Sequence, residues 1–186
     1  MTGMDLTCVN RTGANLSGAN LTNASLSGAD LSGADLSGAD LSGADVTRVN
    51  LMGATLLDTD LTGANLTGAA LSDRDLRSVN LTGAALAASD LRSVNLTGMD
   101  LSGADLSDTN LTDSNLSGVN LTDSNLSGAD LHRTELSDAN LTGANLMGAN
   151  LMGANLMGAD VSHTDLTGVN LTDVNLTDVR LSDGNL

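Results

Sequence analysis

The chain contains no phenylalanine, tyrosine, tryptophan, proline or lysine among its 186 residues. The absence of aromatic residues indicates a narrow interior filled by Leu and Ala, and it removes the stacking platforms that bind single-stranded nucleic acids. The absence of proline is typical of a backbone whose amides take part in hydrogen-bonded ladders. Cys8 is the one cysteine, so no intramolecular disulfide can form and a reducing compartment is favoured.

Basic residues are also scarce. Seven arginines stand against 23 acidic residues, which gives a formal net charge of −16. Such a surface repels phosphate backbones and predicts that nucleic acid is not a partner. No apolar run has the length of a membrane span, and residues 1–5 begin no secretory signal. We therefore expect no membrane association and a cytoplasmic location.

Leucine occupies every fifth position from Leu6 to Leu186, with Arg11, Val46 and Val161 as the exceptions. On an α-helix, leucines spaced by five would scatter over all faces. On a straight strand they would alternate between two faces. They can share one interior only if the chain turns a corner once per pentad. The pattern runs without insertion, and it predicts one solenoid domain over residues 1–186.

The other positions of the pentad also have preferred residues, and we number them from the leucine. In the pentad 31–35, slot 1 is Leu31, slot 2 is Ser32, slot 3 is Gly33, slot 4 is Ala34 and slot 5 is Asp35. Slot 4 is two residues before the next leucine and is small, so we expect it to point inward as well. Slot 5 is nearly always Asp or Asn, whose side chains bond to nearby backbone and support turns. Slots 2 and 3 are suited to the outer wall.

The motif A(D/N)LXX, as in Ala19-Asn20-Leu21, Ala34-Asp35-Leu36 and Ala144-Asn145-Leu146, resembles the pentapeptide-repeat proteins along essentially the whole chain. The resemblance implies an all-β fold, a right-handed quadrilateral parallel β-helix with four pentads per coil and about nine coils. Nothing in the sequence itself shows a twenty-residue period.

Two arginines break the pattern. Arg11 stands in slot 1, where an unpaired guanidinium cannot be buried. We expect the first coil to be frayed, the alternative being a cap that contacts a partner. Arg74 stands in slot 4, and we expect it to swing outward toward Asp73 or Asp75 in a distorted stretch over residues 70–95.

No constellation for catalysis is found. An enzyme needs acid, base or nucleophilic groups that converge in a concavity, whereas polar slots repeat here along convex walls. His132 and His163 should project from different faces, so they cannot share a metal ion. We predict no enzyme activity, no catalytic residue, no metal and no cofactor.

The resemblance extends to quinolone-resistance members that bind DNA gyrase through a rod similar to B-DNA, so it implies a protein partner such as gyrase or another topoisomerase. With four pentads per coil, the corner richest in acids is the predicted partner-binding site. It contains Asp40, Asp58, Asp60, Asp100, Asp138, Asp160 and Asp178. The alternative is a structural scaffold without a dedicated partner, with ice binding through a Ser and Thr column as a remote variant.

The C-terminal coil is more apolar than the others, and we predict a homodimer through the C-terminal ends. The residues expected there are Val169, Val174, Val179, Leu181 and Leu186. Met147, Met152 and Met157 follow leucines in three successive pentads and should form an exposed apolar belt that can serve as a contact surface.

Overall fold

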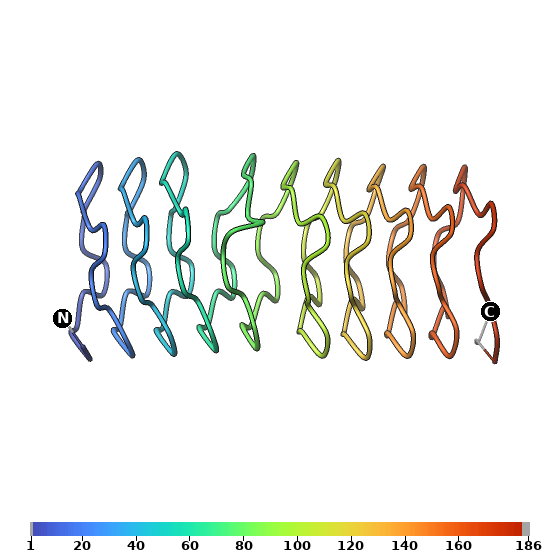
Figure 1. Ribbon diagram of the computed structural model, residues 1–186, viewed down its shortest axis with the longest axis horizontal. Coiled ribbons are helices and arrows are strands. Elements are labelled where there is room, and N and C mark those ends of the chain that lie inside the picture. Colours follow the sequence, from blue (N-terminus) through green and yellow to red (C-terminus); the bar gives the residue numbers. More distant parts are fainter. Residues whose placement is uncertain (1, 184–186) are drawn as a thin grey trace. The chain divides into compact units, whose positions relative to one another are not determined.

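The computed structural model describes residues 2–183, which fall into two compact units. Unit 1 comprises Met1–Ser72 and Ser78–Asp90, and unit 2 comprises Asp73–Arg77 and Leu91–Leu186. Within each unit successive coils lie one beside the next, coloured blue to green in unit 1 and green to red in unit 2 (Figure 1). The expectation of a single domain stays a prediction.

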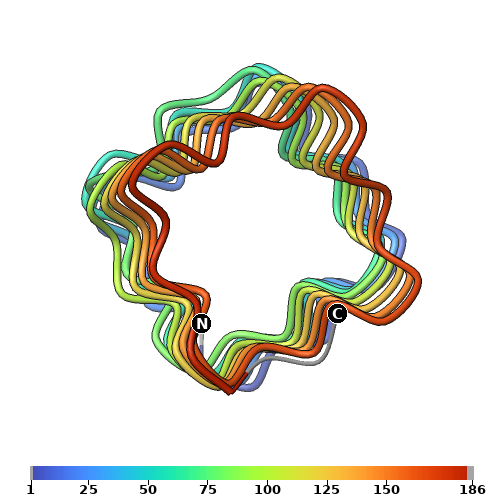
Figure 2. The ribbon, with the colours of Figure 1, turned by 90° about the vertical axis from the view of Figure 1, so that its right-hand side faces the viewer.

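Parallel β-bridges, one residue wide, define the fold. Residues 2–183 include no α-helix and no longer strand. Slot 5 bridges to slot 5 twenty residues further on, as in Asp5↔Ser25 of unit 1 and Asp160↔Arg180 of unit 2. Twenty residues are four pentads, so each unit is a four-sided parallel β-helix, seen end-on in Figure 2. The predicted all-β, four-sided parallel β-helix is confirmed, whereas the expected number of about nine coils stays a prediction.

Every N–H group of a regular pentad has an acceptor. Slots 1 and 3 donate to carbonyls of the following coil, and slot 5 donates to a carbonyl of the preceding coil. Slot 4 donates to the slot-1 carbonyl of its own pentad, and slot 2 donates to the side chain of the slot-5 residue before it. For slots 1 to 5 of the pentad 36–40, the acceptors are Thr55 O (2.8 Å), Asp35 Oδ1 (3.0 Å), Leu57 O (2.8 Å), Leu36 O (2.9 Å) and Ala19 O (3.0 Å). Asp or Asn in slot 5 therefore completes the backbone hydrogen bonding.

Slot 3 has a positive φ in nearly every described pentad. The bond from slot 4 to slot 1 closes a four-residue turn whose third residue is slot 3, the position at which a type II turn requires positive φ. Glycine fills this slot at twenty described positions, with φ between 62° and 73°. Sixteen other residues adopt φ between 52° and 61°, and nine of them are aspartates. Aspartate tolerates this conformation better than most residues.

Slots 1 and 4 form the core of each unit, as the sequence predicts. Leu21, Leu26 and Leu31 are fully buried, and the slot-4 alanines beside them are 0–1% exposed. Threonine or serine in slot 4 is buried too, because its hydroxyl has a carbonyl within reach. In unit 2, Thr134 Oγ1 donates to Leu111 O at 3.0 Å, and Thr164 Oγ1 donates to Leu141 O at 2.9 Å.

One expectation about arginines was wrong, and a second was correct only in part. The first coil of unit 1 is not frayed: Arg11 N donates to Asp30 O at 2.7 Å, and the bridges on either side of Arg11 are formed. Only its side chain departs from the leucine pattern, since it is exposed. In unit 2, Arg74 is half-buried with its Nε covered, so it does not swing fully outward, although the charge of Asp73 acts on it as expected. Burial lowers the pKa of Arg74, and Asp73 partly offsets that effect.

Candidate protein-binding surfaces

Of the 23 acidic residues, fourteen stand in slot 5 and most of these serve the turns. Asp40 is representative: its Oδ1 accepts from Ser42 N at 2.9 Å and from Ser42 Oγ at 2.6 Å, and its Oδ2 accepts from Thr22 Oγ1 at 3.1 Å. The bonds from Ser42 are the main reason that the pKa of Asp40 lies below its ordinary value. Such carboxylates are part of the scaffold, and asparagine replaces them in many pentads.

The other nine acids stand in slot 3, and all of them are exposed. The turn does not require their carboxylates, because glycine occupies the same slot at twenty other positions. Eight of the nine belong to unit 2, and Asp58 alone belongs to unit 1. The eight are Asp73, Asp108, Asp113, Asp123, Asp138, Asp173, Asp178 and Asp183. The sequence pattern showed Asp in this slot, but only the positive φ shows that the acid is dispensable for the turn.

Several slot-3 carboxylates of unit 2 lie over a glycine of the next coil. The Oδ1 atoms of Asp108, Asp123 and Asp138 occupy the space that a Cβ would need on the glycine twenty residues later. A negative group is thus held against the outer wall wherever a slot-3 aspartate is followed by a glycine twenty residues later.

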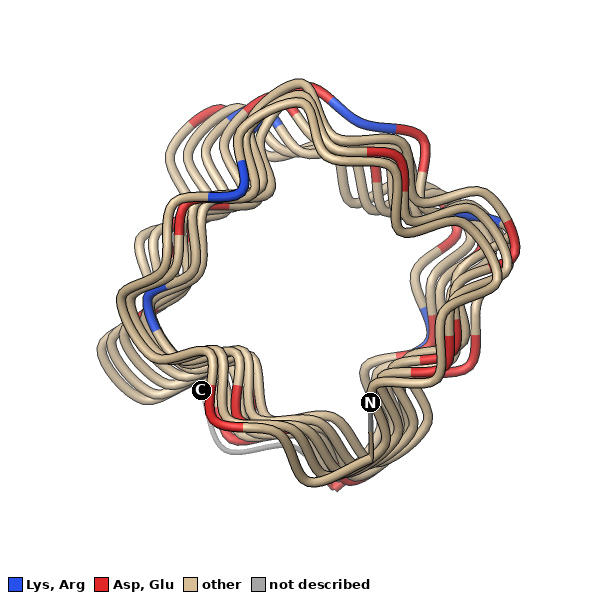
Figure 3. Ribbon diagram, turned by 90° about the vertical axis from the view of Figure 1, so that its left-hand side faces the viewer, with Lys and Arg blue, Asp and Glu red and all other residues tan. Residues whose placement is uncertain are grey.

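The predicted acidic corner divides between the units. Asp40, Asp58 and Asp60 lie in unit 1, where Asp40 and Asp60 form a bridge. The other four residues lie in unit 2. There the slot-5 column runs from Asp100 through two asparagines to Asp160, and Arg180 follows. The column is therefore not continuously acidic. Figure 3 also shows acidic positions on more than one side of the coils.

Two of the acids in unit 2 are neutralised by arginines. Arg133 Nε and Nη2 donate to the two carboxylate oxygens of Asp113, each at 2.7 Å. Arg77 binds Asp75 in the same bidentate way, at 2.9 and 2.6 Å. The bonds from Arg77 lower the pKa of Asp75 to about 2. The pair of Arg133 and Asp113 was not predicted from the sequence, although the two residues are twenty positions apart and therefore lie in the same slot of neighbouring coils.

The three methionines of the expected belt lie on successive sides of unit 2. Met147 and Met157 are 51% and 44% exposed, and Met152 is half-buried. Their role as a contact surface stays a prediction.

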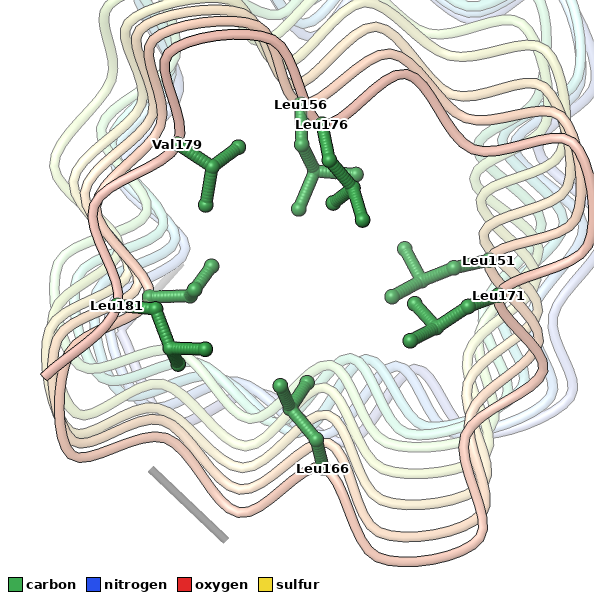
Figure 4. Close-up of a pocket in the computed structure, with 8 residues that line it drawn as sticks. Leu151, Leu156, Leu166, Leu171, Leu176, Val179 and Leu181 are labelled. Atoms are coloured by element: carbon green, nitrogen blue, oxygen red, sulfur yellow. The ribbon is translucent and has the colours of Figure 1, made fainter. Parts of the chain in front are cut away.

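The C-terminal coil of unit 2 exposes its interior. Leu171, Leu176 and Leu181 are 37%, 50% and 47% exposed, whereas leucines of inner coils are fully buried. They surround the mouth of an apolar cavity of about 230 Å³, which Val179 also lines. Figure 4 shows these side chains pointing inward toward one another. Val169 and Val174 are half-buried in the same coil, and Leu186 lies outside the described residues.

The histidines do not come together to form a metal site. His132 Nδ1 is hydrogen-bonded to Met152 O at 2.8 Å. Across residues 2–183 no three His, Cys, Asp or Glu side chains are grouped so that they could hold a metal ion. The same residues include no helix with the length and hydropathy of a membrane span.

Comparison with known families identifies the repeat. A model described as pentapeptide repeats matches the chain in eight copies, over residues 1–23, 14–53, 44–83, 80–118, 114–153 and 154–186. The chain belongs to the pentapeptide-repeat family. No curated protein sequence is significantly similar to this pentapeptide-repeat protein.

Solved structures of other members resemble it. HetL, a pentapeptide-repeat protein from the cyanobacterium Nostoc that is involved in heterocyst differentiation regulation, has 30% sequence identity. The match covers 96% of this chain and 87% of HetL, with a TM-score of 0.60. QnrB1, a plasmid-mediated fluoroquinolone resistance protein, has 24% identity over 97% of this chain and 88% of QnrB1, with a TM-score of 0.48.

Proposed function

We propose that this chain is a non-enzymatic binding module that presents slot-3 carboxylates to a basic, DNA-binding protein partner in the cytoplasm. The observation that carries the proposal is the set of nine exposed aspartates at positions where the fold needs only a residue of positive φ, of which Asp113 is paired with Arg133. Eight of them belong to unit 2, so unit 2 is the proposed partner-binding part.

DNA gyrase is the partner that the resemblance to quinolone-resistance members suggests. B-DNA carries one negative charge per about 1.7 Å of its axis, and a protein that binds DNA offers a complementary positive surface. A net charge of −16 on 186 residues suits such a surface. Charge attraction of this kind weakens as salt rises.

A gyrase supercoiling and binding assay with two matched triple variants tests the proposal. The first variant, Asp123→Gly, Asp138→Gly and Asp178→Gly, removes three slot-3 charges. The second, Asp105→Asn, Asp130→Asn and Asp165→Asn, removes three slot-5 charges from unit 2 and keeps an acceptor for each turn. We expect affinity to fall about tenfold in the first variant, and much less in the second. An equal loss in both would show that only net charge matters, and wild-type protein without effect at micromolar concentration would exclude gyrase.

A second candidate is a regulatory binding module with another protein partner. The identity of 30% and the TM-score of 0.60 to HetL, over nearly the whole chain, favour it. A scaffold without any partner remains the alternative if no protein binds. Ice binding is disfavoured because the hydroxyls of its proposed column bond internally: Thr62 Oγ1 donates to Asp60 Oδ1 at 2.5 Å, and Thr142 Oγ1 donates to Asn140 Oδ1 at 2.6 Å.

The same module is proposed to form a homodimer through its C-terminal coils. The exposed Leu171, Leu176 and Leu181 support this part of the proposal, because burial of each leucine in a partner contributes about 1.5–3 kcal/mol. Light scattering at micromolar concentration should give twice the 18.6 kDa mass of one chain.

A further inference from the structure

We propose that Arg11 protects the N-terminal coil of unit 1 from stacking on the C-terminal coil of another copy. Head-to-tail stacking would compete with the dimer for the C-terminal coil, and with Arg11 in place self-association of the 186-residue chain ends at the dimer of C-terminal coils. This inference rests on the homodimer proposed above and is independent of gyrase.

The backbone alone would permit continuous stacking. Between neighbouring coils of each unit, slot 1 and slot 3 N–H groups donate forward to carbonyls of slots 5 and 2, as in Leu6 N to Ser25 O at 2.7 Å and Gly3 N to Thr22 O at 2.9 Å. The C-terminal coil therefore presents N–H groups, and the N-terminal coil presents the matching carbonyls in the same register. Such a heterologous contact between copies produces rings or filaments unless one end is protected.

Arg11 supplies that protection on the N-terminal coil. Its pentad has the backbone bonds of a leucine pentad, with Arg11 N to Asp30 O at 2.7 Å and Ala14 N to Arg11 O at 2.9 Å. The side chain of Arg11 consequently starts from an inward slot. It is nevertheless exposed, whereas Leu6 in the same coil is buried. Stacking on a C-terminal coil would press the guanidinium onto Leu171, Leu176 and Leu181, and burying an unpaired charge there is costly. Inward-pointing charges protect sheet edges in the same way.

The C-terminal coil has no equivalent charge in its inward slots. Slot 1 is leucine from Leu166 to Leu181, and slot 4 is valine at Val169, Val174 and Val179. Slot-1 N–H groups and slot-4 carbonyl groups point out of the same edge of this coil. For a slot-4 carbonyl, the bond between neighbouring coils from Arg180 N to Ala159 O, at 2.9 Å, shows this direction. Two copies related by a twofold axis can therefore donate and accept reciprocally in antiparallel fashion.

Charge opposes this contact and gives it a distinct salt dependence. Each C-terminal coil carries four acids and one arginine, so two of them repel each other. The five charged residues are Asp165, Asp173, Asp178, Arg180 and Asp183. Salt screens that repulsion. Self-association should strengthen as salt rises, whereas binding of a basic partner to the slot-3 carboxylates should weaken.

Sedimentation and light scattering of four chains test the proposal. We expect dimers for the wild type and for Arg11→Lys, which keeps the charge. Arg11→Leu should form larger species, beyond about four chains at high concentration. Leu176→Asp, which places a charge in the C-terminal coil, should be a monomer. Thermal melting checks that each variant is folded. Arg11→Leu should fold, because leucine is the residue that slot 1 normally holds.

The outcomes separate this proposal from the proposed function. An Arg11→Leu chain no larger than the wild type would overturn the protective role of Arg11, as would a wild type that already forms filaments. A monomeric wild type would overturn the dimer as well. Gyrase binding should be unchanged in Arg11→Leu, because this variant retains every slot-3 carboxylate. The outcomes for Arg11 therefore do not depend on the proposed gyrase binding.

Discussion

The carboxylate of Asp138 lies over Gly158, one coil further on in unit 2, in the space that a Cβ on Gly158 would need. Gly158 also has a φ of +73°, in the left-handed region. Glycine is therefore favoured at this position for two separate reasons, one conformational and one steric.

Gly158→Ala should separate those two reasons. We expect it to destabilise the fold by about 1–2 kcal/mol from its backbone conformation alone, and by more from contact with Asp138 Oδ1. Gly98→Ala is the control, because Gly98 has a φ of +69° and nothing within 4 Å of an added Cβ. Denaturant unfolding should rank Gly158→Ala as the more destabilising, and adding Asp138→Gly should abolish the difference between Gly158→Ala and Gly98→Ala. Equal losses in the two single variants would show that Asp138 moves aside freely.

The parts of the fold set by side-chain size could be predicted from the sequence. Leucine at every fifth position and small residues in slot 4 define one interior, and the structure buries both. The coil of twenty residues followed only from the family resemblance, because no residue repeats with that period. The state of Arg11 could not be predicted, since backbone bonds such as Arg11 N to Asp30 O hold the first coil in place without an apolar side chain.

Asn115 tests the contribution of slot 5 to the turns. Its Oδ1 accepts from Ser117 N at 3.0 Å and from Ser117 Oγ at 2.7 Å. Asn115→Ala removes both bonds at an exposed site, and we expect a loss of about 1 kcal/mol. For a protein of this size that loss lowers the melting temperature by about 2–4 °C. Asn115→Asp keeps the acceptor and should melt close to the wild type, so a similar decrease in both variants would argue against the turn bond.

The candidate site was less predictable than the core. The sequence placed seven acids at one corner, but it could not distinguish carboxylates that serve a turn from those that do not. Asp40 and Asp138 illustrate the difference. Asp40 accepts three hydrogen bonds from Ser42 and Thr22, whereas Asp138 occupies a positive-φ slot that glycine fills elsewhere. Only backbone angles and hydrogen bonds reveal that difference.

Acid should weaken the fold through the slot-5 carboxylates. Hydrogen bonds from Ser37 lower the pKa of Asp35 in the folded state, and Asp30, Asp40 and Asp165 shift in the same direction. A lowered folded pKa stabilises the fold above the unfolded pKa of about 3.9, and that stability is lost as pH falls through the folded value. Wild-type melting temperature should therefore fall relative to Asp35→Asn between about pH 5 and pH 2. Asparagine keeps the acceptor but does not titrate, so a pH-independent difference between the two would contradict this assignment.

Thr134 tests whether hydroxyls in the core are needed. It is fully buried in slot 4 of unit 2, and its Oγ1 donates to Leu111 O at 3.0 Å. Leu111 O also accepts from Ser114 N at 3.1 Å, so it keeps a partner when the hydroxyl is removed. Thr134→Val retains the shape of the side chain, and Val119 shows that slot 4 accepts a buried valine. We therefore expect Thr134→Val to change the free energy of unfolding by less than about 1 kcal/mol. Thr134→Ala, which also removes a methyl group, should lose about 0.5–1.5 kcal/mol more. A large loss in the valine variant, measured by denaturant unfolding, would mean that the hydroxyl bond itself holds neighbouring coils together.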